Sequence, residues 1–196
     1  MSRPPRPRTV HPIEVRSYEI LRSRADTSGL PPLTRAVTER VIHASADLDY
    51  LGDLVVSGED DLAAAAAALR AGTPVVADVE MVAAGITAVT PVCRVRGAAA
   101  GPGLTRSAAA IRMAYDEVGP GAVWVVGNAP TALEEILRLG VRPALVVGLP
   151  VGFVGAAESK QALREACLPA VSNRGEKGGS AVAAAAVNAL LYWEGS

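Results

Sequence analysis

Aromatic residues are scarce in this chain. They make up 4% of its 196 residues, whereas half of all residues are hydrophobic. Much of the apolar content is alanine and valine. Because alanine is the best helix former and valine favours strands, we expect alanine-rich helices packed closely on valine-rich strands. A chain of this length and composition can form one domain with a substantial core.

An excess of one charge is also absent. The 19 basic residues nearly balance the 20 acidic ones, which leaves a formal net charge of −1. This balance gives no sign of a surface for nucleic acid or membranes, so an anionic ligand would need a local cluster of basic residues. The basic, proline-rich start leads into no apolar stretch, and no uncharged run approaches the roughly 20 residues that span a bilayer. We therefore expect a soluble, cytoplasmic protein.

The chain contains only two cysteines, Cys93 and Cys167, which lie far apart in the sequence. They form no metal-binding spacing, and we expect neither a metal site nor a disulfide. Cys93 belongs to an apolar run, which is typical of a small buried side chain. The signatures of a Ser-His-Asp elbow, a zinc site and a carboxylate pair are missing as well, so no such motif identifies a reaction.

Short apolar segments alternate with helical segments along most of the chain. We expect strands at residues 74–77, 90–95, 122–126, 144–147 and 170–172. We expect helices at residues 12–21, 32–43, 62–70, 79–85, 105–118, 131–139, 156–166 and 179–193. A capping box from Thr131 to Glu134 should open the sixth of these helices.

This alternation predicts an α/β fold of three layers, with a mainly parallel sheet of about five strands and helices on both faces. We interpret residues 1–10 as a flexible tail and residues 11–196 as a single domain. In such folds ligands bind outside the carboxyl ends of the strands. The loops that follow the expected strands are therefore the candidate ligand site.

Two of these loops could bind an anion. Residues 148–155 are rich in glycine and precede a helix, so their N–H groups could meet a phosphate or carboxylate. They match neither the dinucleotide fingerprint nor the P-loop, and a structural turn explains them equally well. Residues 173–180 contain Arg174 and Lys177, and this loop could either clamp an anion or be solvated.

His43 is the first candidate for chemistry. It lies at the end of an expected helix, and Arg40 is one turn earlier, so the two side chains should share a face. A histidine can give and take a proton near neutral pH, and an arginine beside it can hold a carboxylate. Taken alone, the local pattern favours a histidine that merely interacts with the helix dipole. The other histidine, His11, is expected to be solvated.

Several segments, in order along nearly the whole chain, resemble the precorrin-8X methylmutase family. The segment from Pro150 to Lys160 is the most specific of them. The matching segments are Ile13-Glu14…Ser17-Tyr18, Arg40-Val-Ile-His43, Asp78…Met81-Val82…Gly85-Ile86, Thr105-Arg-Ser-Ala-Ala-Ala110, Val126-Gly-Asn-Ala-Pro-Thr-Ala-Leu133, Pro150-Val-Gly-Phe-Val-Gly-Ala-Ala-Glu-Ser-Lys160 and Gly178-Gly-Ser180…Asn188-Ala-Leu190.

The resemblance implies an isomerase of cobalamin biosynthesis. The family moves a methyl group from C11 to C12 of precorrin-8X, giving hydrogenobyrinic acid, without an external cofactor. It implies that His43 is the acid–base residue, that Ser17 and Arg40 bind substrate, and that the protein is a homodimer. Because the substrate carries many carboxylate arms, we add four candidate substrate contacts from the strand-end loops and helix starts: Arg106, Asn128, Lys160 and Lys177.

Three alternatives remain open from the sequence. The substrate could be the cobalt-containing form of the same macrocycle, because a metal inside the ring needs no protein ligand. The chain could instead bind a tetrapyrrole without catalysis. It could also be a nucleotide-binding α/β domain that uses residues 148–155, although it lacks that fingerprint.

Overall fold

A single five-stranded sheet lies at the centre of the computed structural model, which describes residues 11–194; the expected tail at residues 1–10 lies outside the described residues. The strand order is β1-β5-β4-β3-β2. Strands β2 to β5 are mutually parallel, and β1 is antiparallel to β5 at one edge. The strands are β1 (Leu54–Val56), β2 (Val75–Ala77), β3 (Val123–Val126), β4 (Leu145–Gly148) and β5 (Ala170–Asn173).

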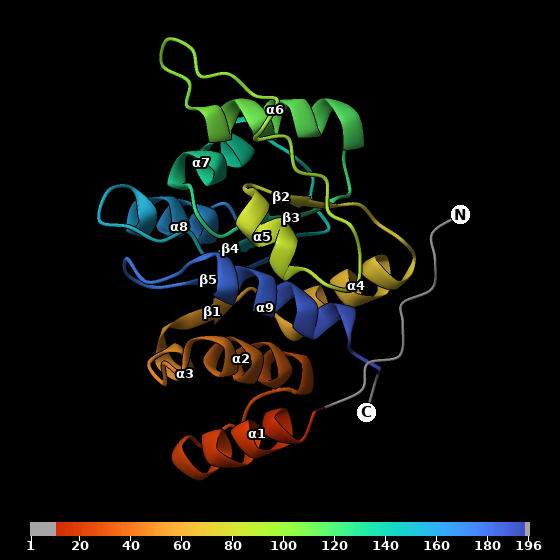
Figure 1. Cartoon of the computed structure of the whole chain (residues 1–196), viewed down its shortest axis with the longest axis vertical. Helices are drawn as coiled ribbons and strands as arrows, with labels where there is room; N and C mark the ends of the chain where they lie inside the picture. Colours follow the sequence, from red (N-terminus) through yellow and green to blue (C-terminus); the bar gives the residue numbers. More distant parts are fainter. Residues whose placement is uncertain (1–10, 195–196) are drawn as a thin grey trace.

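Helices cover both faces of this sheet, which confirms the predicted three-layer α/β fold (Figure 1). One face is covered by α4, α5 and α9, with α2 packed on the outer side of α9, and the other face is covered by α6, α7 and α8. The helices are α1 (Pro12–Arg24), α2 (Pro32–Ser45), α3 (Tyr50–Asp53), α4 (Glu59–Arg70), α5 (Glu80–Gly85), α6 (Arg106–Val118), α7 (Pro130–Arg138), α8 (Ala156–Glu165) and α9 (Ser180–Leu191). None of the helices described is long and apolar enough to cross a membrane.

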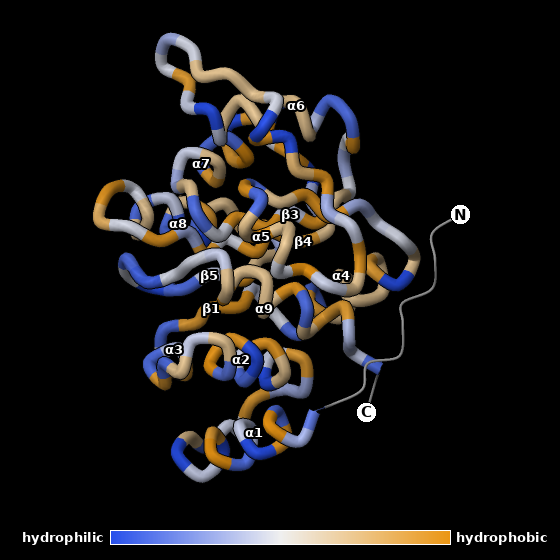
Figure 2. Tube along the Cα trace, viewed as in Figure 1, coloured by the Kyte–Doolittle hydropathy of each residue, from blue (hydrophilic) through white to orange (hydrophobic). Residues whose placement is uncertain are grey.

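The central strands are apolar on both sides. In β3, Val123 and Val125 join the core beneath α9, whereas Trp124 and Val126 join the core beneath α6 and α7. A parallel strand with both faces covered has no reason to alternate apolar and polar residues. Figure 2 shows the resulting concentration of hydrophobic residues along the central strands and α9.

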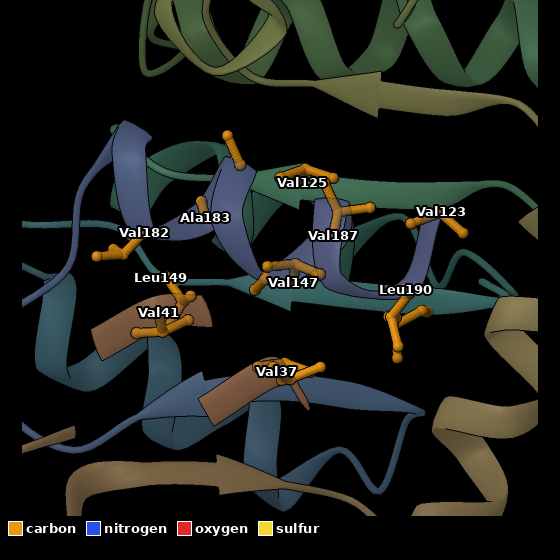
Figure 3. Close-up of a cluster of buried hydrophobic side chains, with 14 of the residues drawn as sticks. Val37, Val41, Val123, Val125, Val147, Leu149, Val182, Ala183, Val187 and Leu190 are labelled. Carbon is orange, nitrogen blue, oxygen red and sulfur yellow. The ribbon is translucent and has the colours of Figure 1, made fainter. Parts of the chain in front are cut away.

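Helix α9 is buried on almost every side because it lies between the sheet and α2. Figure 3 shows Val187 of α9 between Val125 and Val147 of the strands, with Val37 and Val41 of α2 nearby. Half of the residues of α9 are alanine, and their small side chains let neighbouring backbone approach closely. A Cβ added at Gly127 would lie 2.8 Å from the Ala183 side chain. The expected close packing of alanine-rich helices is confirmed.

Two sequence predictions about the strands were wrong. Residues 90–95 do not form a strand, and within them only Val92 pairs, in an isolated bridge with Val76. Pro91 lacks a backbone N–H to donate, and a turn begins at Val95. Strand β1 was missed because it has only three half-buried residues and follows directly on the four-residue helix α3.

The capping box expected at Thr131 was also wrong. Helix α7 begins at Pro130, whose missing N–H suits the first helical position, and its N-cap is Ala129. The Thr131 hydroxyl instead bonds the Thr105 hydroxyl at 2.8 Å and so joins the starts of α6 and α7. The other expected helices agree with the structure to within three residues at each end.

Candidate active site

His43 lies in the last turn of α2, where α1 packs against it. Its Nδ1 is 2.7 Å from the Ser17 hydroxyl of α1, which can donate or accept depending on the imidazole tautomer. The Tyr18 ring stacks on the imidazole, with centroids 5.1 Å apart and planes 12° from parallel. Two consecutive residues of α1 therefore fix both an edge and a face of the His43 ring.

Arg40 of α2 also contacts helix α1. It lies on the face of α2 that carries His43, as the three-residue spacing predicts, and its Nη1 is 2.5 Å from Glu14 Oε1. The Arg40 side chain is only 18% exposed. A guanidinium has five N–H donors, so this pairing leaves capacity for a ligand carboxylate. The structure thus brings together His43, Ser17 and Arg40 from the set of expected site residues.

Glu39 fixes the contact between α1 and α2. This buried carboxylate accepts hydrogen bonds from Arg22 of α1 at 2.7 Å, from Arg35 at 2.9 Å and from Thr27 at 2.5 Å. Burial acts to raise the pKa of Glu39, but these donors outweigh it and hold the pKa at about 2. Since Leu21 is the one buried hydrophobic residue of α1, the position of this helix depends strongly on polar contacts.

Replacing Glu39 should weaken this contact in a pH-dependent way. Because the folded pKa is depressed from 4.5 to about 2, the carboxylate stabilises the fold above pH 4.5, and this stabilisation is lost as the pH falls toward 2. Glu39→Gln should lower the free energy of unfolding by about 3 kcal/mol near neutral pH, and by about 1 kcal/mol at pH 3. Urea denaturation of both proteins at pH 7 and pH 3 measures this difference.

A matched control is Glu19→Gln. Glu19 also pairs with an arginine, Arg16, but both side chains are more than half exposed. An exposed pair contributes little, so this variant should unfold within about 0.5 kcal/mol of the wild type at either pH. Equal stability of Glu39→Gln and the wild type at pH 7 would contradict the assigned role.

A shallow, wide-open groove of about 480 Å³ runs along the outer side of α1, and all of its lining residues belong to that one helix. Its lining is mostly apolar and includes Ser17, so the groove reaches the residue that contacts His43. Its residues are Pro12, Ile13, Arg16, Ser17 and Ile20. Ile13 is 73% exposed.

The end of α2 lies at the carboxyl edge of the sheet. The turn after α2 contains Asp47 and Asp49, and both carboxylates pair with the Lys177 ammonium, that of Asp47 at 2.8 Å. These two carboxylates raise the pKa of Lys177. Lys177 belongs to the loop after β5, so His43 is near one strand-end loop. Its ring, however, faces α1 rather than the strand ends.

Lys160 is buried beneath that loop, with none of its surface exposed. Its ammonium donates to Asn173 Oδ1 at 2.9 Å and to the Lys177 carbonyl at 2.5 Å. Burial, followed by the nearby Arg164, lowers the pKa of Lys160 to about 8. Direct contact between Lys160 and a ligand would therefore require the loop to move.

Arg106 and Asn128 are exposed and lie away from His43. Arg106 begins α6, and Asn128 precedes α7, whereas α1 lies at the opposite end of the long axis (Figure 1). The buried Asp78 carboxylate holds the Asn128 loop by accepting three backbone N–H groups at 2.9–3.1 Å. Burial raises the pKa of Asp78 although these donors act to lower it.

The glycine-rich loop at residues 148–155 has structural reasons for its glycines. A Cβ at Gly148 would lie 2.6 Å from the Leu163 side chain, so this glycine lets α8 approach the sheet. Gly155 adopts the left-handed conformation at the start of α8. Between them, Phe153 and Val154 are 94% and 88% exposed, and Figure 2 shows a hydrophobic tip on this loop. The loop therefore has a closely packed base and an exposed apolar tip.

Sequence reasoning did not single out Glu14, Tyr18 or Glu39 as site residues. A usable signal existed for Glu14, which lies three residues before Ser17 and so shares its helix face. Nothing in the sequence indicated that α1 would lie on α2, because that contact depends on the loop between them. Within residues 11–194, no group of three or more potential metal ligands occurs, and Cys93 and Cys167 are free thiols.

Comparisons with known proteins agree with this architecture. The cobalt-precorrin-8 methylmutase of Salmonella typhimurium is 43% identical over 197 residues, covering 92% of this chain and 93% of its own. The precorrin-8X methylmutase of Sinorhizobium is 43% identical over 192 residues, covering 89% and 90%. The crystal structure of the Thermus thermophilus precorrin-8X methylmutase superposes with a TM-score of 0.80 at 35% identity, over 91% of this chain and 93% of that one. A sequence model of precorrin-8X methylmutases matches residues 12–193, and the chain belongs to the precorrin-8X methylmutase family.

Proposed function

We propose that this chain is the isomerase of cobalamin biosynthesis that moves the C11 methyl group of precorrin-8X to C12, giving hydrogenobyrinic acid. The observation that carries the proposal is the His43 imidazole, held by Ser17 at 2.7 Å and by the stacked Tyr18 ring at the seam of α1 and α2. Membership of the family supports the substrate and the reaction.

His43 supplies the proton on which the methyl shift depends. Protonation of the conjugated ring changes its electron demand, and an imidazole can donate and recover a proton near neutral pH. The bond from C11 to the methyl carbon breaks as the bond to C12 forms, and the proton then returns to the imidazole. Substrate and product have the same composition, so the reaction consumes no cofactor.

The carboxylate arms of the substrate would meet basic and polar side chains. We assign this role to Arg40 and Lys177, with Ser17 orienting His43, and leave out Arg106 and Asn128 because they lie away from His43. Arg40 and Lys177 are already paired with Glu14 and with the Asp47 turn, respectively. A bound substrate carboxylate would therefore replace or share the carboxylate partners of Arg40 and Lys177.

We also propose that the protein acts as a homodimer in the cytoplasm. Support comes from apolar side chains at the surface, namely Ile13 on α1 and Phe153 and Val154 on the loop before α8. Adjacent exposed apolar side chains such as Phe153 and Val154 are typical of interaction sites.

The test is turnover of precorrin-8X by the purified chain, followed through the absorbance of the orange product. We expect hydrogenobyrinic acid to accumulate. Binding of the macrocycle without turnover would instead favour a non-catalytic tetrapyrrole-binding protein, and neither binding nor turnover would overturn the assignment.

The cobalt-containing substrate is the second candidate. Relatives at the same 43% identity are named for either form, so identity does not separate them. Parallel assays with precorrin-8X and cobalt-precorrin-8 decide between them by rate.

A nucleotide-binding domain is disfavoured because Gly148 is closely packed by Leu163 and because the Asp78 carboxylate already accepts the N–H groups after β3.

A further inference from the structure

We propose that Lys160 is a positioning residue for the reaction. It lies beneath the loop after β5 and fixes that loop. The loop in turn holds the turn that follows α2, and so the end of the helix that carries His43. The inference rests on the proposed function. It concerns a residue that lies outside the groove and does not touch His43.

The first step is the bond between Lys160 and the loop. The ammonium binds Asn173 Oδ1 at 2.9 Å and the Lys177 carbonyl at 2.5 Å, and the Asn173 amide binds the same carbonyl at 2.9 Å. The two side chains together hold the Lys177 carbonyl, and the Asn173 amide also donates to the Arg174 carbonyl at 3.0 Å. Lys160 is completely buried, so its position is set by the surrounding core of α8 and β5.

The second step joins the loop to the turn after α2. Lys177 pairs with Asp47 at 2.8 Å and with Asp49. The backbone N–H of Arg174 donates to the Asp53 carbonyl at 2.9 Å, and the Arg174 guanidinium donates to the Gly52 carbonyl at 3.0 Å. The loop is thus bonded at several points to the segment that begins four residues after His43.

The third step is the conformation of that turn. Ala46, which ends α2, adopts the left-handed region with φ of 55°, a conformation that is unfavourable for a residue with a Cβ. A strained residue keeps its conformation only when surrounding contacts enforce it. The ion pair of Asp47 with Lys177 is next to Ala46, so it is placed to enforce this conformation.

The chemistry of Lys160 also points away from a purely structural role. Burying an ammonium costs free energy, and an apolar side chain of the same length would fill the space at lower cost. What the charge adds is directional hydrogen bonding to two acceptors of the loop. Small displacements of a catalytic group reduce turnover strongly, so a fixed loop is worth this cost at an active site.

The main experiment replaces Lys160 with Met, which keeps the length of the side chain and removes its donors. We expect Lys160→Met to fold and to lower kcat about tenfold, with KM changed less than threefold. Hydrogen exchange of the backbone amides at residues 44–53 should become faster. Gln161→Met, an exposed neighbour on the same helix, is the matched control and should leave both kcat and exchange unchanged.

A second variant keeps the test decisive if Lys160→Met folds poorly. Asp47→Asn acts at the surface and removes one ion pair of Lys177 without disturbing the core. It should lower kcat in the same direction and speed exchange over the same segment. In the double variant the two effects should be less than additive, because both act through one loop.

The outcomes separate this inference from the proposed function. A wild-type protein that does not convert precorrin-8X refutes the proposed function, and with it the role of Lys160 in that reaction. With an active wild type, an unchanged kcat and unchanged exchange at residues 44–53 in Lys160→Met overturn the inference. Fully additive effects in the double variant overturn it as well.

Discussion

His43→Ala is expected to reduce turnover of precorrin-8X by about 10²- to 10⁴-fold, the usual contribution of a positioned acid–base group. Alanine cannot donate a proton to the macrocycle, and Ser17 and Tyr18 would then border an empty space. The fold should persist because His43 lies in the last turn of α2, on the face turned away from the core residues Val37 and Val41. Initial rates and far-ultraviolet circular dichroism measure the two parts of this expectation.

The control is the other histidine. His11 precedes α1 and its ring accepts a hydrogen bond from the Ile13 N–H, a capping role that asparagine can also fill. His11→Asn should therefore retain wild-type turnover. A His43→Ala protein that keeps more than half of the wild-type rate would remove the proposed role of His43.

Gly178→Ala is expected to destabilise the protein more than other substitutions in the loop after β5. A Cβ at Gly178 would lie 2.3 Å from the Leu149 carbonyl oxygen and 2.5 Å from that of Pro150. Backbone carbonyls cannot rotate away as a side chain can, so the loop or the end of β4 must shift. We expect a loss of at least about 3 kcal/mol and a fall in Tm of about 6–12 °C, measured by thermal denaturation.

Gly175→Ala, in the same loop, separates crowding from backbone conformation. Gly175 also has a positive φ, of 74°, but no atom lies within 4 Å of an added Cβ. Only the conformational cost of about 1 kcal/mol applies, so Tm should fall by about 2–4 °C. Similar Tm values for the two variants would show that the close approach at Gly178 is relaxed in solution.

The apolar strands and the alanine-rich helices could be predicted from the sequence because each has a strong local signal. Residues 122–126 are apolar without interruption, and the strand β3 was found there. The edge strand β1 could not be predicted, because three half-buried residues owe their extended form to pairing with β5. The strand predicted at residues 90–95 was wrong for the opposite reason. These residues have a strand-like composition, but only Val92 among them pairs, in a bridge with Val76.

The candidate site divides in the same way. His43 and Arg40 could be placed on one helix face from their spacing, and the resemblance supplied the role proposed for His43. The contact of His43 with Ser17 spans 26 residues of sequence, and no periodicity encodes it. The burial of Lys160 could not be predicted from the sequence either, because a lysine at a helix start is ordinarily solvated.

By itself, the sequence determined the α/β class, the positions along the chain of the segments that form the parallel strands, and the family. These depend on local propensity, apolar runs and motifs, all of which are found along one chain. Only the tertiary structure decided that α1 lies on α2, that Glu39 holds it there, and that Lys160 supports the loop after β5 from within. These features join residues distant in sequence through buried polar contacts. Their partners become defined only when the sheet and α9 have brought the helices together.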